Sequence, residues 1–405
     1  MNFPLLLANR INVKGQRTFS KLIVRVTIGA LSLAIIAILL SVAILRGFKE
    51  EITTKQRGFF GDIIVTRHEL SPTDITPVLL GEAQKDSLLK IPGVLSISPF
   101  ATQVGIINVN DEVEGIMLKG IDSLYNQSFL NSCLVEGELL DLKAERADQQ
   151  LLISHYLANR LKLDVGDNLI MSFVQDKRIR KRKFIIQGIF RTNSDDWDKN
   201  YVVGSLDVIR KLNNLLPNEA GAYEIRISDF SQLTQATEAV NDALPMHLKA
   251  SNVVEYWADV FNWLEMLDMN DDIIFVLMVI VAVINMISSL LITILERTNM
   301  IGILKALGMN NGDLRKVFIW NSLYIIGYGL LIGNIFAFAI YMFQRATHFF
   351  KLDPSIYYLE FVPMNIDILS VLILNLSVVA VVLLTTIIPS MLVTRISPIK
   401  TIQFK

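Results

Sequence analysis

The chain has 405 residues, of which 52% are hydrophobic and 19% are charged, and its formal net charge is −1. Four stretches of 20 to 28 residues contain no charged side chain, and about 20 helical residues span the roughly 30 Å hydrocarbon core of a bilayer. The apolar stretches exclude a purely soluble protein and a disordered chain. A disulfide-framed secreted module is also excluded, because the one cysteine, Cys133, has no internal partner.

The first charge-free stretch, Val26–Leu45, follows a basic segment. Residues 1–25 contain five basic side chains and no acidic one. Both the apolar stretch and the basic segment are longer than those of a signal peptide. We therefore expect a cytoplasmic N-terminus over residues 1–25 and an uncleaved transmembrane helix over residues 26–47.

The long segment from residue 48 to residue 270 carries the patterns of a mixed α/β domain. β-branched runs between turn residues predict strands over Ile63–Thr66, Val104–Val109, Glu114–Gly120, Asn168–Val174, Lys183–Phe190 and Tyr223–Ile227. Apolar residues at helical spacing predict helices over residues 154–163, 230–244 and 253–270, the last of which continues into the next span as one long or bent helix. The domain is large enough for a sizeable core in one or two lobes.

Three further spans follow, and the charges around them indicate the topology. The charge-free stretches predict transmembrane helices over residues 271–295, 317–344 and 368–394, with loops at 296–316 and 345–367 and a tail at 395–405. The 296–316 loop has four basic and two acidic residues, and the tail has three basic residues and no acidic one. Because Lys and Arg accumulate on the cytoplasmic side, we expect both termini inside and the α/β domain outside. The predicted fold class is a four-helix membrane protein with a large extracytoplasmic domain between helices 1 and 2.

Polar and small residues within the spans predict contacts between helices. Asn285, Asn334 and Asn375 lie deep in the second, third and fourth spans. Since lipid offers no hydrogen-bond partner, we expect these side chains to face other helices, and a substrate contact is the alternative. Gly329-x-x-x-Gly333 predicts close helix packing, and Pro389 predicts a kink or a helix end.

The sequence carries no motif of a catalytic chain. It contains no phosphate-binding loop and no nucleophile elbow, and its four histidines are isolated from one another. Asp195, Asp196 and Asp198 surround Trp197, which predicts an acidic loop, with a calcium site as the alternative. We expect no catalytic residue, no metal site and no cofactor in this chain.

Six of the seven residues from Lys177 to Lys183 are cationic. The run lies between two predicted strands, so we expect the tip of a hairpin. Nucleic acid is not the expected partner of an outer domain. Two interpretations stay open: a solvated tip, or a docking arm for an acidic partner or anionic lipid headgroups.

The cytoplasmic segment Glu296–Gly308, with the sequence ERTNMIGILKALG, carries the most specific pattern. Ile301, Leu304, Lys305 and Gly308 recur at helical spacing between two spans. The segment resembles the coupling helix of the FtsX/MacB-type (type VII) ABC permeases, which docks into the ATPase subunit. The resemblance implies a docking site made of Glu296, Arg297, Ile301, Gly302, Leu304, Lys305, Leu307 and Gly308.

The resemblance extends along most of the chain. Residues 40–51 resemble the end of the first span in the lipoprotein-releasing permeases LolC and LolE, residues 152–167 resemble a strand–helix–turn of that family's outer domain, and residues 397–402 resemble its C-terminal ending. It implies a permease subunit that extracts outer-membrane lipoproteins from the inner membrane and passes them to a periplasmic chaperone. The alternatives are a related permease for peptide or drug export, a cell-division permease that transports nothing, and a membrane receptor or scaffold.

The resemblance also implies partners and two further sites. The partners are a LolD-like cytoplasmic ATPase that carries ATP and Mg, a second permease copy or paralogue, a LolA-like periplasmic chaperone, the lipoprotein substrate and membrane lipid in the bacterial inner membrane. The implied lipoprotein-facing residues are Leu45, Phe48, Phe261, Leu264 and Leu267, for which mutual packing is the alternative. The implied chaperone-docking hairpin carries Lys177, Arg178, Arg180, Lys181 and Arg182, at the place of the family's hook.

Overall fold

The computed structural model describes residues 18–68, 76–109, 112–175, 178–353, 357 and 359–395. The chain divides into two compact units. The membrane unit takes its described residues from Met1–Lys49, Trp263–Lys351 and Phe361–Lys405, and the α/β unit from Glu50–Asn262 and Leu352–Glu360. The predicted tail signature at residues 397–402 and the basic residues before Thr18 lie outside the described residues.

Four long helices in the described part of the chain are apolar enough to cross a membrane. They are α2 (Thr18–Phe60), α10 (Ala258–Glu296), α12 (Asn311–Thr347) and α14 (Ile368–Arg395), with the short helix α11 (Thr298–Ala306) between α10 and α12. α2 is one unbroken helix that continues thirteen residues past the predicted end of its span at residue 47. Pro389 lies inside α14, which continues to Arg395, so the prediction of a helix end there was wrong.

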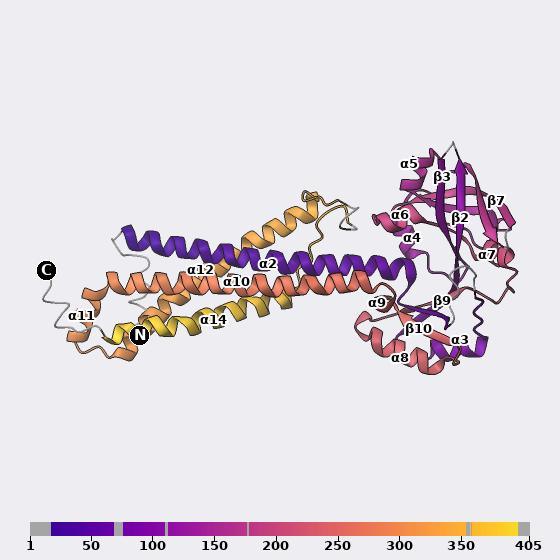
Figure 1. Cartoon of the computed structure of the whole chain (residues 1–405). Coiled ribbons are helices and arrows are strands. Elements are labelled where there is room, and N and C mark those ends of the chain that lie inside the picture. Colours follow the sequence, from indigo (N-terminus) through magenta and orange to yellow (C-terminus); the bar gives the residue numbers. More distant parts are fainter. Residues whose placement is uncertain are drawn as a thin grey trace. The chain divides into compact units, whose positions relative to one another are not determined.

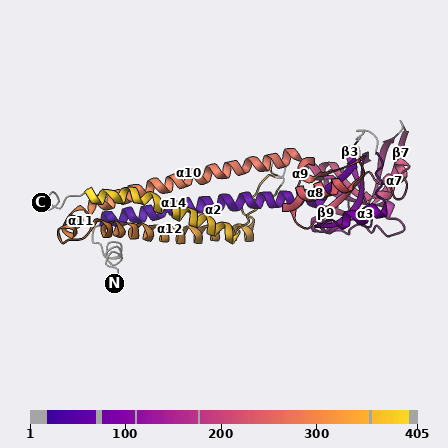
Figure 2. The same cartoon turned by 90° about the horizontal axis from the view of Figure 1, so that it is seen from below.

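The helices of the membrane unit lie side by side (Figure 2) and share one apolar core. Leu31 of α2, Met286 of α10, Phe318 of α12 and Val382 of α14 are all buried in it. Because lipid tails are as apolar as these side chains, close packing rather than the hydrophobic effect holds such helices together. The tightness of the helix seams therefore decides how the bundle is held.

The predicted glycine seam is confirmed. A Cβ on Gly329 would lie 2.6 Å from Leu31 Cδ2, and one on Gly333 would lie 2.9 Å from Ile35 Cβ, both on α2. Ser32 Oγ donates a hydrogen bond to Gly329 O at 3.1 Å across the same seam. The absence of side chains at the two glycines thus lets α12 approach the backbone of α2 closely.

The prediction that buried asparagines face other helices is confirmed for two of the three. Asn334 Nδ2 of α12 donates to Asn375 Oδ1 of α14 at 3.2 Å, and Asn375 Nδ2 donates to Asn334 Oδ1 at 3.0 Å. Each amide thereby satisfies the other without water or lipid. Asn285 is half-buried on α10.

The α/β unit is built on ten described strands (Figure 1). The strands are β1 (Ile63–Arg67), β2 (Val94–Val109), β3 (Glu112–Ile121), β4 (Leu134–Gly137), β5 (Gln150–Ser154), β6 (Asn168–Gln175), β7 (Arg178–Phe190), β8 (Tyr201–Ser205), β9 (Ala222–Ile227) and β10 (Leu248–Asn252). The short helices are α3 (Glu82–Leu89), α4 (Ser128–Cys133), α5 (His155–Leu161), α6 (Asp195–Asn200), α7 (Leu206–Asn213), α8 (Leu233–Ala243) and α9 (Val253–Tyr256), with 3₁₀ turns η1 (Ala147–Gln149) and η2 (Phe230–Gln232). All six predicted strands are confirmed within β1, β2, β3, β6, β7 and β9.

Strand pairing closes part of this sheet into a ring. The order is β10-β1-β9-β2-β3-β8-β5-β7-β4, and β6 pairs with both β7 and β2. The pairs β2–β3, β3–β8, β8–β5, β5–β7, β7–β6 and β6–β2 therefore form a closed circuit of six strands. Of the remaining strands, β9, β1 and β10 extend from β2, and β4 pairs with β7; α3 lies against β2 and α8 against β10. The ring leaves none of its own six strands at an edge, whereas β10 and β4 end the described strand order.

Two local predictions in this unit were wrong. The basic run Arg178–Lys183 is not a hairpin tip, because it forms strand β7 in register with β6; Lys177 lies outside the described residues. The acidic stretch at 195–198 is part of helix α6, and Asp198 is buried rather than in an exposed loop. The helix predicted over residues 253–270 is confirmed in its bent form: α9 and α10 meet at Trp257, and α10 continues into the second span.

Candidate functional site

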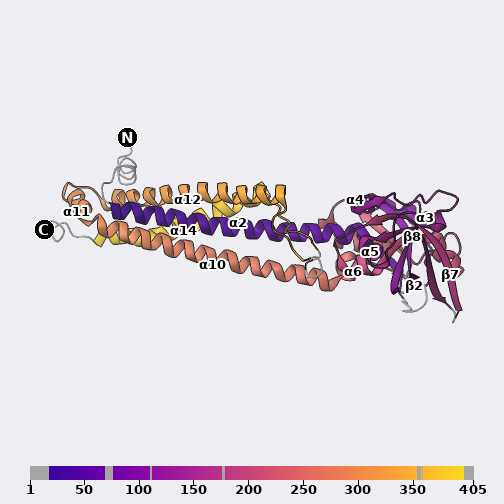
Figure 3. The same cartoon turned by 90° about the horizontal axis from the view of Figure 1, so that it is seen from above.

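The predicted coupling segment forms helix α11 at the end of the bundle where α10 ends and α12 begins (Figure 3). Glu296 is the last residue of α10, and Gly308 follows α11 with a φ of +91°, which only glycine adopts without strain. Asn310 then caps α12 by accepting a hydrogen bond from Asp313 N at 2.8 Å. Two tight turns thus fix a helix of nine residues between two spans.

One face of α11 is anchored to the membrane unit. Ile301 has no exposed surface, Gly302 is buried, and Leu304 packs against the bundle core. Lys305 Nζ donates a hydrogen bond to Thr394 O of α14 at 3.0 Å. Ile301 and Gly302 were predicted as docking residues, but they face the bundle because α11 packs by this side.

The opposite face of α11 is exposed and apolar. Ile303 is 53% exposed and Leu307, four residues later, is 79% exposed, with exposed Ala306 beside them. Ile303 and Ala306 were not among the predicted docking residues, although the i, i+4 spacing of Ile303 and Leu307 places those two on one face. At the start of the segment, Glu296 Oε2 and Arg297 Nε are buried without a hydrogen-bond partner among the described residues. The face that carries Ile303, Ala306 and Leu307 is the exposed part of the segment, where another protein can make contact.

The other end of the bundle is held by polar contacts around α2. Arg46 pairs with Asp367 at 3.1 Å, Lys49 pairs with Asp268 of α10, and Ser41 Oγ donates to Asp271 Oδ1 at 2.6 Å. A Cβ on Gly47 would lie 2.7 Å from the carbonyl carbon of Pro363. The backbone before α14 therefore passes directly against α2. These contacts fix α2 against α10 and α14 within the membrane unit.

The predicted lipoprotein-facing residues separate into packed and accessible side chains. Phe48 is buried and meets the Trp263 ring edge-on with centroids 6.2 Å apart, and Leu264 is also buried. Phe261 belongs to the α/β unit, where it stacks on Phe230. Leu45 and Leu267 are half-buried. For Phe48, Leu264 and Phe261 the structure therefore shows packing within the chain.

Two exposed methionines, which were not among the predicted lipoprotein-facing residues, lie near the same end of α10. Met266 is 53% exposed and Met269 is 60% exposed. Methionine is unbranched and polarisable, so it adapts to irregular apolar surfaces. Both lie inside the helix predicted over residues 253–270, close to the predicted second span.

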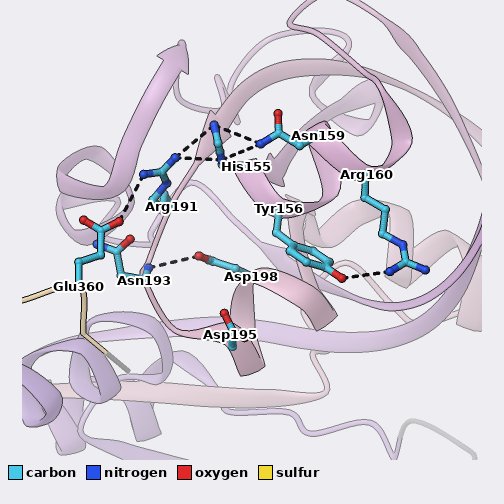
Figure 4. A pocket seen from close by; sticks show the side chains of 9 residues that line it. All are labelled: His155, Tyr156, Asn159, Arg160, Arg191, Asn193, Asp195, Asp198 and Glu360. Carbon is cyan, nitrogen blue, oxygen red and sulfur yellow. Dashed lines mark hydrogen bonds and ion pairs between the residues drawn. The ribbon is translucent and has the colours of Figure 1, made fainter. Parts of the chain in front are cut away.

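A polar pocket of about 550 Å³ lies in the α/β unit (Figure 4). Arg191, at the end of β7, contacts His155 Nδ1 of α5 at 3.0 Å and pairs with Glu360 Oε1 at 3.3 Å. Glu360 belongs to the connection between α12 and α14, and its carbonyl accepts from Leu352 N at 2.8 Å. Arg191 therefore joins this connection to the α/β unit.

The acidic residues of the pocket serve the fold. Asp198 accepts hydrogen bonds from Thr192 Oγ1 at 2.7 Å and from the backbone N–H groups of Thr192 and Asn193. Burial raises the pKa of Asp198 above its ordinary value, against the lowering effect of these bonds. No three His, Cys, Asp or Glu side chains of the described chain are grouped to hold a metal ion.

Sequence comparison decides the family. MacB-like periplasmic core domains match residues 26–243, more than half of the chain, and the FtsX-like permease C-terminal family matches residues 273–398. The chain belongs to this family of ABC permeases. The permease is thus a membrane protein with a MacB-like extracytoplasmic domain between its first two helices, which confirms the predicted fold class. Permeases of ABC transporters are not themselves catalytic.

The permease is similar along its whole length to two named relatives. It is 20% identical to the lipoprotein-releasing system transmembrane protein LolE of Haemophilus influenzae over 98% of each chain. It is also 20% identical to LolC of Xylella fastidiosa over 98% of this chain and 97% of that one. Among solved structures, the periplasmic region of MacB from Actinobacillus actinomycetemcomitans matches with a TM-score of 0.35 and 15% identity, over 51% of this chain and 95% of that one. The resemblance predicted from the sequence motifs is confirmed.

Proposed function

We propose that this permease extracts outer-membrane lipoproteins from the bacterial inner membrane and passes them to a LolA-like periplasmic chaperone. A single observation carries the proposal: the similarity to LolE and LolC covers both the membrane unit and the α/β unit. Both termini and α11 then lie in the cytoplasm, as the basic flanks predict. A second permease copy or paralogue completes the transmembrane part.

A separate LolD-like ATPase supplies the energy and docks on the exposed face of α11. Ile303 and Leu307 form an apolar contact surface, and Ile301, Gly302 and Lys305 hold it against the bundle. Because α11 is fixed at both ends by turns, a displacement by the ATPase moves α10 and α12 together. ATP and Mg belong to that subunit.

The substrate explains why the permease needs a guided path for lipid. Each buried methylene is worth about 0.8 kcal/mol, so three acyl chains with about 45 methylenes resist transfer to water by roughly 36 kcal/mol. The chains must therefore move from the bilayer onto an apolar protein surface without entering bulk water. Leu45 and Leu267, with the exposed Met266 and Met269, are the residues we assign to the entrance of that path.

The basic strand of the β6–β7 hairpin is the surface we assign to the chaperone. Arg178 and Lys181 are exposed, whereas Arg180 is half-buried and donates to Leu212 O at 2.9 Å. Exposed cations on a strand attract an acidic surface and speed its encounter. Lys177 and Arg182 belong to the same basic run.

Reconstitution tests this function. The permease is purified with its ATPase, placed in liposomes with a triacylated lipoprotein and mixed with soluble chaperone. We expect ATP to transfer lipoprotein into the soluble fraction only when the chaperone is present. ATP hydrolysis without any lipoprotein release would instead favour the related export or cell-division function.

Photo-crosslinking tests the lipid path in the same liposomes. A photoreactive residue at Met269 should capture lipoprotein before ATP is added and lose it after ATP and chaperone are supplied. The matched control is Leu376 of α14, which is 71% exposed on another helix of the bundle. Equal labelling at both positions would show general lipid contact and would remove Met269 from the path.

A further inference from the structure

The C-terminal end of α2 is enclosed by charged side chains of the α/β unit. Lys119 of β3 and Glu224 of β9 are each 1% exposed and form an ion pair at 3.1 Å. Lys119 Nζ also donates a hydrogen bond to Phe59 O, a carbonyl in the last turn of α2. A buried lysine thus caps the helix that begins in the membrane unit.

Further contacts hold the same helix end. Arg226 donates to Gly58 O at 2.9 Å, and Arg57 pairs with Asp62, whose Oδ2 accepts from Ile227 N at 2.8 Å. The last carbonyls of a helix have no partner within the helix and carry partial negative charge, so cations stabilise them. Two cations from two strands, Lys119 and Arg226, therefore donate to the last carbonyls of α2, while Arg57 of α2 itself bonds Asp62.

Aromatic rings complete the enclosure around Lys119. Its ammonium lies 4.9 to 5.4 Å from the ring centres of Phe59, Phe60, Phe100 and Tyr125. Rings at this distance attract a cation through their faces. Phe59 in turn stacks on Trp197 with centroids 5.0 Å apart. The helix end is thereby fixed in rotation as well as in position.

Stability alone does not explain a charged pair at this place. Replacing a buried ion pair by apolar residues of similar volume is often neutral or stabilising, because both charges lose their hydration on burial. Burial lowers the pKa of Lys119, and the Glu224 carboxylate opposes that effect. The charged Lys119 provides a directional hydrogen bond to the backbone of α2, which an apolar side chain of similar volume would not provide.

We propose that Lys119 and Glu224 form a joint that locks the end of α2 to β3 and β9, so that movement of α2 is transmitted into the α/β unit. Both are positioning residues, since neither contacts the substrate in this account. The inference rests on the proposed lipoprotein release for its functional consequence. Its structural part, a fixed orientation of the α2 end, stands without that function.

The test replaces both charges at once so that the domain keeps its fold. The double variant Lys119→Met with Glu224→Leu is made in the full-length permease with its ATPase. The control is Val240→Ala, a buried position on α8 that belongs to a different apolar cluster from Phe59 and Phe60 of α2. Two measurements are taken on each: lipoprotein released per ATP hydrolysed, and the distance between spin labels at Thr54 on α2 and Gln235 on α8, in a Cys133→Ser background.

The joint predicts that the double variant folds and hydrolyses ATP but releases at least fivefold less lipoprotein per ATP, with a broadened distance distribution. The control should keep both the release ratio and the narrow distribution. A double variant with unchanged distances overturns the joint, whatever the transported substrate. If the unmodified complex releases no lipoprotein, the proposed function fails, while the distance measurement still decides the joint.

Discussion

Helix α2 is held in two different ways along its length. In the core of the membrane unit it packs by shape, with Leu31 and Ile35 against the bare backbone of Gly329 and Gly333, and its stretch from Ser41 to Lys49 is held there by polar contacts. In the α/β unit its end is held by buried charge, through Lys119, Glu224 and Arg226. Packing by shape allows one helix to slide or separate at low cost, whereas a buried charge bonded to a helix end has one arrangement.

The largest expected effect is at the charged end. Lys119→Ala removes the closer of the two cations that face the buried Glu224 and leaves only Arg226 at 3.9 Å, which should lower the free energy of unfolding by about 3–5 kcal/mol. Denaturant unfolding of the full-length permease in detergent, followed by tryptophan fluorescence, measures this. The double replacement by methionine and leucine should recover most of the loss. If Lys119→Ala is as stable as the unmodified protein, the Lys119–Glu224 pair does not contribute to the free energy of unfolding.

The glycine seam should show a smaller effect. Gly329→Ala places a methyl group within 2.6 Å of Leu31, and overpacking of this kind costs about 1–3 kcal/mol. Gly327→Ala is the matched control, because its Cβ would meet no atom within 4 Å. Unfolding in increasing SDS compares the two variants. Equal stability of both would mean that the seam is not tight.

The asparagine pair should show the smallest effect. Asn334→Ala, Asn375→Ala and the double variant form a double-mutant cycle, and the coupling energy expected for a hydrogen bond between membrane helices is about 0.6 kcal/mol. The same SDS unfolding provides the four values. A coupling energy near zero would indicate that each amide finds another partner when its neighbour is removed.

Sequence predicted the membrane unit better than the α/β unit for a physical reason. A charge-free stretch of 20 or more residues has one stable outcome in a bilayer, so the four spans could be located without knowing their neighbours. Strands depend on partners that are distant in sequence. The short polar strand β10, LKASN, is a strand because it pairs with β1 about 185 residues earlier, and it was missed.

The same dependence limited the prediction of the sites. Helical spacing located α11 but not which of its faces packs on the bundle, so the buried Ile301 and Gly302 were assigned to the partner and the exposed Ile303 was not. The basic run was interpreted by its charges alone. Its side chains alternate between exposed and less exposed positions along β7, and this alternation continues to the buried Phe184. Lys119 gives no signal in the sequence EVEGIMLKGI, because its burial is created by Glu224, 105 residues later.

The most direct test of the central claim, that a separate ATPase drives this permease through α11, is ATPase turnover in a purified complex. Leu307→Asp places a charge on the exposed face of α11, and Leu216→Asp makes the same change at an exposed position of the α/β unit. We predict that Leu307→Asp abolishes ATPase copurification and lipoprotein-dependent turnover, and that Leu216→Asp changes neither. Normal copurification and turnover in Leu307→Asp would contradict docking at α11.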